Sequence, residues 1–170
     1  RSMAQGWLMI SNGRPLRARE AFKKALEIDP ESQSAKYGLA LTNPQDADLT
    51  GWPEPEAAVI RGELWSRAGD WSKLQALDTP LSEVAAGSML YPEAARLRAT
   101  WRLASRDSAR GWEAVELIDV LIARDQNPWD LLLRAEGAGL SGRTDYAWAS
   151  LSRMSSSMKR ASNRKQLAKR

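Results

Sequence analysis

Residues 6–30 read GWLMISNGRPLRAREAFKKALEIDP, and this stretch sets the architecture expected for the whole chain. Apolar residues recur at helical spacing on both sides of a turn at residues 12–15, so the stretch predicts two short antiparallel helices, near residues 3–12 and 16–28. The proline of that turn stands where a helix begins well. Pro30 ends the second helix, because proline lacks an amide donor and restricts the residue before it.

The second predicted helix carries small and large apolar residues side by side. Ala18 and Phe22 lie one helical turn apart, so a neighbouring helix can approach closely over the alanine and still be filled by the ring. A single hairpin of this kind cannot bury its apolar face. It therefore implies further helices stacked against it.

Five positions of this stretch fall at the spacing of the tetratricopeptide repeat, and the segment closely resembles that family: Gly6, Ala18, Phe22, Ala25 and Pro30. The residues after Pro30 open another helix, in which Ala40 lies 34 residues after Gly6, which is the period of the family. The resemblance is strong over residues 4–40, weaker over 92–155 and poor between 42 and 91. The style of the sequence, rich in alanine, arginine and tryptophan, suggests a bacterial member.

The repeat pattern breaks at residues 42–56, TNPQDADLTGWPEPE, which contain three prolines and one glycine. This composition predicts a loop with one short helical turn, in the place where a regular repeat supplies its second helix. Helical periodicity then resumes and predicts helices near residues 57–68, 70–78 and 81–90.

The C-terminal half shows clearer helical stripes. Helices are predicted from residue 92 to about 104, over 112–122, over 128–140, and from about 144 past residue 160. The expected fold is all-α: an α-solenoid of about four irregular tetratricopeptide-like hairpins with a long closing helix. The repeat domain is assigned to residues 1–157, and residues 158–170 form a basic tail that continues the last helix.

Composition argues against catalysis. The chain of 170 residues contains no cysteine and no histidine, which removes thiol chemistry, histidine general bases and the usual soft metal sites. No glycine-rich phosphate loop is present. We therefore expect no enzyme activity, no cofactor and no metal. No apolar run is long enough to span a membrane, and the compartment stays open between bacterial periplasm and cytoplasm.

The resemblance implies a ligand groove on the concave face, which is lined by the first helix of each hairpin. The family's groove positions correspond here to Met3, Trp7, Ile10, Tyr37, Leu41, Glu63 and Trp101. The basic clamp that chaperone-binding members use for a C-terminal carboxylate is missing, since Met3 and Trp7 occupy its first two positions. An apolar and aromatic groove instead suits an extended peptide or a partner helix.

The charge of the chain is unevenly distributed. The net charge is +4. The sequence after Asp145 contains seven Lys and Arg residues and no Asp or Glu, so residues 1–145 carry −3. Contact with nucleic acid or an anionic membrane surface through counterion release is therefore an alternative, and the candidate residues are Lys159, Arg160, Arg164 and Lys165. No aromatic residue follows Trp148 to stack on bases.

The function expected from the sequence is a non-catalytic scaffold that binds a protein or peptide partner. By analogy with similar bacterial modules, it would serve envelope assembly, secretion or polysaccharide export. A second alternative to this function is a self-associating architectural domain, a homo-oligomer in which some of the eight Trp residues are buried against another copy.

Overall fold

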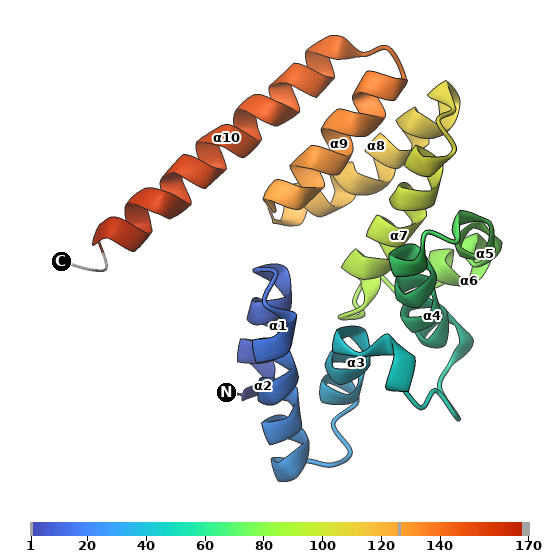
Figure 1. Cartoon of the computed structure of the whole chain (residues 1–170), viewed down its shortest axis with the longest axis vertical. Helices are drawn as coiled ribbons and strands as arrows, with labels where there is room; N and C mark the ends of the chain where they lie inside the picture. Colours follow the sequence, from blue (N-terminus) through green and yellow to red (C-terminus); the bar gives the residue numbers. More distant parts are fainter. Residues whose placement is uncertain (1, 126, 168–170) are drawn as a thin grey trace.

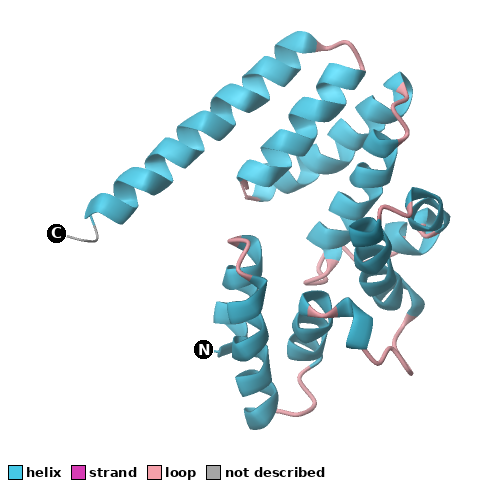
Figure 2. Cartoon of the chain, in the orientation of Figure 1, coloured by secondary structure: helices cyan, strands magenta, loops and turns pink. Residues whose placement is uncertain are grey.

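The computed structural model describes residues 2–125 and 127–167, with side chains described as far as residue 159. This part of the chain forms ten α-helices and one 3-10 helix and contains no strand (Figures 1 and 2). The predicted all-α class is therefore confirmed for these residues. Consecutive helices pack on one another along most of the chain. Within the described residues, none of the helices combines the length and the apolar character that crossing a membrane requires.

The predicted N-terminal hairpin is confirmed. Helix α1 (Ser2–Ser11) and helix α2 (Pro15–Ile28) pack together, and α3 (Gln33–Thr42) packs against both. Gly13 adopts a φ of +66° in the turn, a left-handed conformation that favours glycine. The Arg14 amide then donates to the Met9 carbonyl at 2.8 Å and closes the end of α1.

Phe22 is the centre of this N-terminal unit. Its side chain is fully buried between Gly6 of α1 and Gly38 of α3. A β-carbon at Gly6 would lie 2.5 Å from the ring, and one at Gly38 would also overlap it. The two glycines therefore let both helices close directly onto the ring. Trp7 adds an edge-to-face contact with Phe22, with ring centroids 5.4 Å apart.

The predicted loop is also present, and it contains the 3-10 helix η1 (Pro44–Asp46) before α4 (Glu54–Ala68) begins. Two short helices follow, α5 (Trp71–Ala76) and α6 (Asp78–Ser82). The helix predicted over residues 81–90 is wrong, because residues 83–90 form turns.

The reason for this difference is that the segment offers little to a helix. Leu81, Val84 and Leu90 are buried, but Ala85, Ala86, Gly87 and Met89 are exposed. Residues 85–87 bury no apolar side chain that would hold a helix against the core, and glycine disfavours a helix by about 1 kcal/mol. The backbone instead closes turns, such as the bond from the Ser88 amide to the Ala85 carbonyl at 2.8 Å.

The C-terminal half consists of four longer helices: α7 (Tyr91–Ala104), α8 (Ser108–Arg124), α9 (Pro128–Leu140) and α10 (Thr144–Leu167). Each packs against the next one. The last helix runs past residue 160 as predicted, and its C-terminal end extends away from the other helices (Figure 1).

Helices α8 and α9 approach each other closely at a pair of glycines. A β-carbon at Gly137 would lie 2.6 Å from the carbonyl oxygen of Gly111. The obstacle is backbone, which cannot rotate away as a side chain can. Glycine is therefore required at this crossing by the space between the helices, and its helix-disfavouring effect is outweighed by packing.

An ion-pair cluster joins α6 to α7 and α8. The Asp78 carboxylate accepts hydrogen bonds from Arg98 Nε at 3.1 Å, Trp101 Nε1 at 2.9 Å and Arg102 Nη1 at 2.6 Å. Arg102 Nε also donates to Glu113 of α8 at 2.9 Å. Burial alone would raise the pKa of Asp78, but the donors on Arg102, Arg98 and Trp101 hold that pKa well below its ordinary value.

Most buried apolar side chains of the described residues belong to one of three clusters. One surrounds Phe22 in α1 to α3, a middle one extends from α3 to α7, and a third lies between α7 and α9. Trp7 and Ile10 pack against both the first and the middle cluster, and Tyr91 packs against both the middle and the third. These three side chains therefore connect the successive parts of the core.

Candidate functional site

Two adjoining hollows form an elongated groove on the structure. They share the lining residues Ile10, Ser11, Glu93, Arg96 and Asn127, which come from the end of α1, from α7 and from the turn before α9. One hollow, of about 280 Å³, continues toward α3 and α4, and the other, of about 180 Å³, continues along α1 and the end of α8. The groove thus brings together helices that are far apart in the sequence.

Four of the seven residues predicted to bind a partner line this groove: Trp7, Ile10, Leu41 and Glu63. Ile10 lines both hollows. Trp7 is half-buried, and its Nε1–H donates to Ser34 Oγ at 2.9 Å, so its ring is held in a fixed orientation beside Phe22. Leu41 is buried and contributes to the middle core cluster as well as to the groove wall.

The other three predicted residues line neither hollow. Met3 is exposed and its sulfur accepts a hydrogen bond from Ser32 Oγ at 3.7 Å. Tyr37 packs edge to face against Trp52, with centroids 4.9 Å apart. Trp101 belongs to the buried core and donates to Asp78.

Several groove residues were not predicted from the sequence: Arg67, Glu93, Arg96, Trp129 and Asp130. Trp129 is 65% exposed at the start of α9. The Asn127 side chain fixes this start, because its Oδ1 accepts the Trp129 amide at 3.0 Å. Asn127 followed by Pro128 predicts the start of a helix, but the sequence does not show that this helix end lies near α1.

The charged groups in the groove are mutually paired. Arg96 holds Asp130 through two hydrogen bonds, Nε to Oδ1 at 2.7 Å and Nη2 to Oδ2 at 2.9 Å, and its Nη1 donates to Glu93 at 2.6 Å. Asp130 is almost completely buried, so this is a strong, charge-assisted contact that joins α7 to α9. Arg67 pairs with Glu63 at 2.9 Å and donates to the Leu41 carbonyl.

Each of these guanidinium groups already has an acceptor, and Arg124 likewise donates to the Ala86 carbonyl at 3.1 Å. The arginines therefore stabilise the groove walls and are not arranged as a clamp for a ligand carboxylate. The walls combine apolar and aromatic surface with satisfied charges.

The pKa of Glu93, which lines both hollows, is raised above its ordinary value of 4.5. Burial is the main cause that raises its pKa, and the neighbouring carboxylates of Glu63 and Asp130 add to it, whereas Arg96 opposes the rise. A carboxyl group whose pKa is raised on folding contributes stability below its unfolded pKa, near 4.5, and loses it as the pH rises through the folded pKa.

Replacing Glu93 with glutamine is therefore expected to stabilise the chain progressively, relative to the parent, as the pH rises from 4 to 7. The amide keeps an oxygen for Arg96 and cannot ionise. Urea unfolding at several pH values measures the difference, and exposed Glu83→Gln on the turn after α6 provides the control. A difference that stays constant or falls over this pH range would contradict the expectation.

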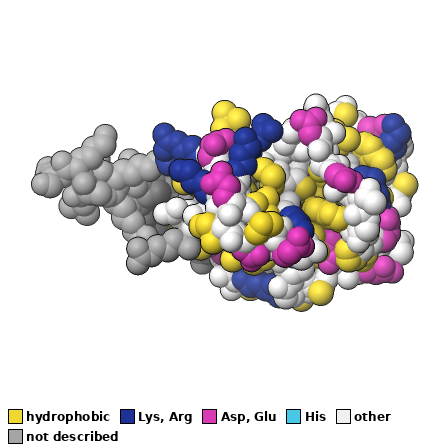
Figure 3. Space-filling model, turned by 90° about the horizontal axis from the view of Figure 1, so that it is seen from below, with side chains coloured by type: hydrophobic (Ala, Val, Ile, Leu, Met, Phe, Trp, Pro, Cys, Tyr) yellow, Lys and Arg dark blue, Asp and Glu magenta, His cyan; other side chains and the backbone are white. Residues whose placement is uncertain are grey.

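The basic residues suggested for polyanion binding lie on α10. Lys159 is exposed, whereas the side chains of Arg160, Arg164 and Lys165 lie outside the described residues. On the face shown in Figure 3, basic, acidic and hydrophobic side chains are interspersed.

Comparison of the chain with protein-family models, with curated proteins and with solved structures finds no match.

Proposed function

We propose that the chain is a non-catalytic scaffold, an irregular tetratricopeptide-like solenoid that holds an extended peptide or a partner helix in the groove between α1 and α9. The observation that carries the proposal is the groove itself. Side chains from α1, α3, α4, α7 and α9 line it, together with Pro15 of α2 and the end of α8. In the family that the sequence resembles, the first helices of the successive pairs form the binding face. The setting in bacterial envelope assembly, secretion or polysaccharide export is part of the proposal and rests on resemblance alone.

The lining also favours one kind of partner. Its acidic residues are Glu63, Glu93, Asp125 and Asp130, and its basic residues are Arg67, Arg96 and Arg124. The excess of one acid is small, but the arginines are occupied by acceptors within the chain. A carboxylate can accept several donors, so Glu63 and Glu93 retain capacity for a ligand. A partner segment with apolar residues around a Lys or Arg therefore fits best.

Selection of peptides on the immobilised chain tests this function. One library displays random linear peptides and a second displays helical peptides with random surface positions. We expect enriched sequences that combine apolar residues with at least one basic residue.

Two matched tryptophan variants locate the binding site. Trp129→Ala, in the groove, should weaken the selected peptides at least about tenfold, because an exposed tryptophan at an interface often contributes much of the binding energy. Trp148→Ala removes a ring that is 69% exposed on α10, outside the groove, and should leave affinity unchanged. Equal losses in the two variants, or no enriched sequence from either library, would contradict the proposal.

A further inference from the structure

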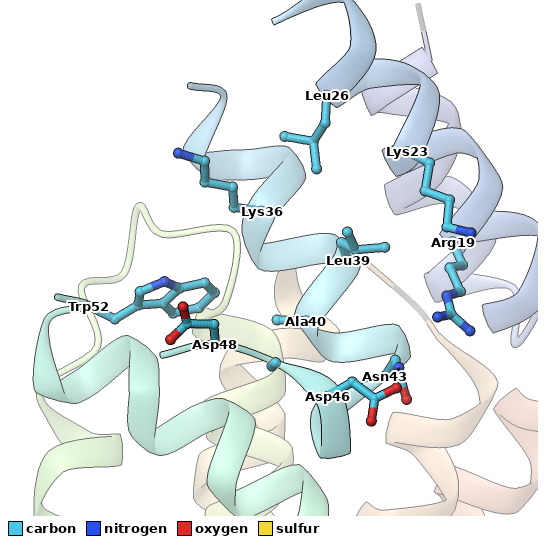
Figure 4. A pocket seen from close by; sticks show the side chains of 11 residues that line it. Arg19, Lys23, Leu26, Lys36, Leu39, Ala40, Asn43, Asp46, Asp48 and Trp52 are labelled. Carbon is cyan, nitrogen blue, oxygen red and sulfur yellow. Dashed lines mark hydrogen bonds between the residues drawn. The ribbon is translucent and has the colours of Figure 1, made fainter. Parts of the chain in front are cut away.

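A third hollow, separate from the groove, lies between α2, α3 and the loop at residues 43–53 (Figure 4). Its volume is about 300 Å³, and its lining shares no residue with the groove. It is located where the irregular loop replaces the second helix expected of a regular repeat. A volume of this size is at the lower end of pockets that bind small molecules.

Three cations line this hollow: Arg19 and Lys23 on α2 and Lys36 on α3. The Arg19 Nε–H is buried and finds no hydrogen-bond acceptor in the described part of the chain. A buried donor without a partner is costly, so a turn of the Arg19 side chain that brought this N–H to a ligand oxygen would be favoured. Lys23 and Lys36 pair with Glu20 and Glu31, but both acids are exposed and such pairs contribute little.

The floor of the hollow is apolar. Leu26, Leu39 and Ala40 form it, and Figure 4 shows Leu39 and Ala40 between Arg19 and the indole ring of Trp52. Tyr37 packs edge to face against Trp52 and holds that ring in place. The hollow therefore has Arg19 and Lys23 on one side and Trp52 on the other, with apolar residues between them and with Lys36 and Asp48 on the Trp52 side (Figure 4).

Two acids also line the hollow, and both are held within the loop. Asp46 Oδ2 accepts the Asn43 side-chain amide at 2.6 Å. Asp48 Oδ1 accepts the Thr50 backbone amide at 3.0 Å, and its hydrogen bonds with Thr50 lower the pKa of Asp48, so it stays ionised at neutral pH. Among the described residues neither acid forms an ion pair with Arg19, Lys23 or Lys36, and the acids that pair with the two lysines are the exposed Glu20 and Glu31.

We propose that this hollow binds a small organic anion. Its oxyanion group, a carboxylate or a phosphate, is held by Arg19 and Lys23, and its apolar body lies over Leu26 and Leu39 toward Trp52. The planar guanidinium of arginine matches both kinds of oxyanion, which is why the two are named together. The site is independent of peptide binding in the groove.

The test uses the full chain labelled with 5-fluorotryptophan and observed by fluorine NMR. The Trp52 resonance is assigned from the Trp52→Phe variant. Three probes with the same ring system are titrated: 2-naphthyl phosphate, 2-naphthoate and neutral 2-naphthol. We expect a saturable shift of the Trp52 resonance with an anionic probe, at least about tenfold tighter than with the neutral one, because a charge-assisted hydrogen bond is worth that factor. The tighter of the two anions identifies the class of oxyanion.

Two substitutions should each weaken the anionic probe about tenfold: Arg19→Gln and Lys23→Gln. Lys24→Gln, on the same helix but outside the hollow, should leave the affinity unchanged. Lys23 is exposed, so its variant should fold normally and keeps the test valid if Arg19→Gln does not fold. Equal affinity for the neutral probe, a Trp52 resonance that does not respond, or unchanged affinity in Lys23→Gln would overturn the proposal.

Discussion

Phe22→Ala is expected to lower the free energy of unfolding by about 3 kcal/mol or more, since removal of a fully buried aromatic ring leaves a cavity. Gly6 of α1 and Gly38 of α3 face the ring from both sides. Neither residue has a side chain that could move into the cavity. Denaturant unfolding measures the loss. Leu16→Ala, which alters a side chain that is 79% exposed on the same helix, is the control and should change stability little.

A second substitution separates the fit around the ring from burial in general. Gly38→Ala alone should destabilise the chain, because its β-carbon would overlap the Phe22 ring. In the Phe22→Ala background the same change should cost much less, so the two effects should not add. A negligible shift of the unfolding midpoint in Phe22→Ala, or additive effects in the double variant, would contradict the described packing.

Asp78→Ala is expected to cost about 3 kcal/mol, because it removes the carboxylate shared by Arg98, Trp101 and Arg102. The Arg102 side chain is only 10% exposed and would lose its closest acceptor. The loss should also loosen α6 from α7, which hydrogen exchange of the α6 amides can detect. Glu136→Ala, at an exposed position of α9, is the control.

The effect of Asp78 should depend on pH in a defined direction. Its pKa in the folded state is lower than its ordinary value of 3.8, so the carboxylate contributes stability above about pH 3.8 and loses it as the pH falls toward the folded pKa. The difference in unfolding free energy between parent and Asp78→Ala should therefore be constant from pH 8 to 5 and shrink below pH 4. A difference that grows on acidification would show that the ion-pair cluster is not the cause.

Local patterns were sufficient to predict most helices. The helical stripes, the turn at residues 12–15 and the prolines gave the N-terminal pair, the loop and the C-terminal helices close to their observed positions. The prediction of a helix over residues 81–90 was wrong. The apolar residues Val84 and Leu90 are buried, but they lie on either side of three small exposed residues and are not on one helical face. Whether such a segment folds as a helix depends on the surface that covers it.

The groove was less accessible to sequence reasoning. Residues on α1, α3 and α4 could be aligned with the family pattern, and four of them line it. The contact between Arg96 and Asp130 joins positions 34 residues apart, and no local pattern specifies it. The same holds for Gly38 and Gly137, since a glycine required by close approach resembles any other until its neighbour is known.

Trp7 and Ile10 belong both to the core and to the groove. They connect the N-terminal core cluster to the middle one, and they also line the groove. Fraying of the first two helices would therefore remove part of the proposed binding surface. A partner bound there would oppose that fraying by an amount that grows with the logarithm of its free concentration relative to its Kd. The proposed partner and the amino-terminal segment would thus be thermodynamically linked, so slower proteolytic cleavage of that segment would report binding of the partner.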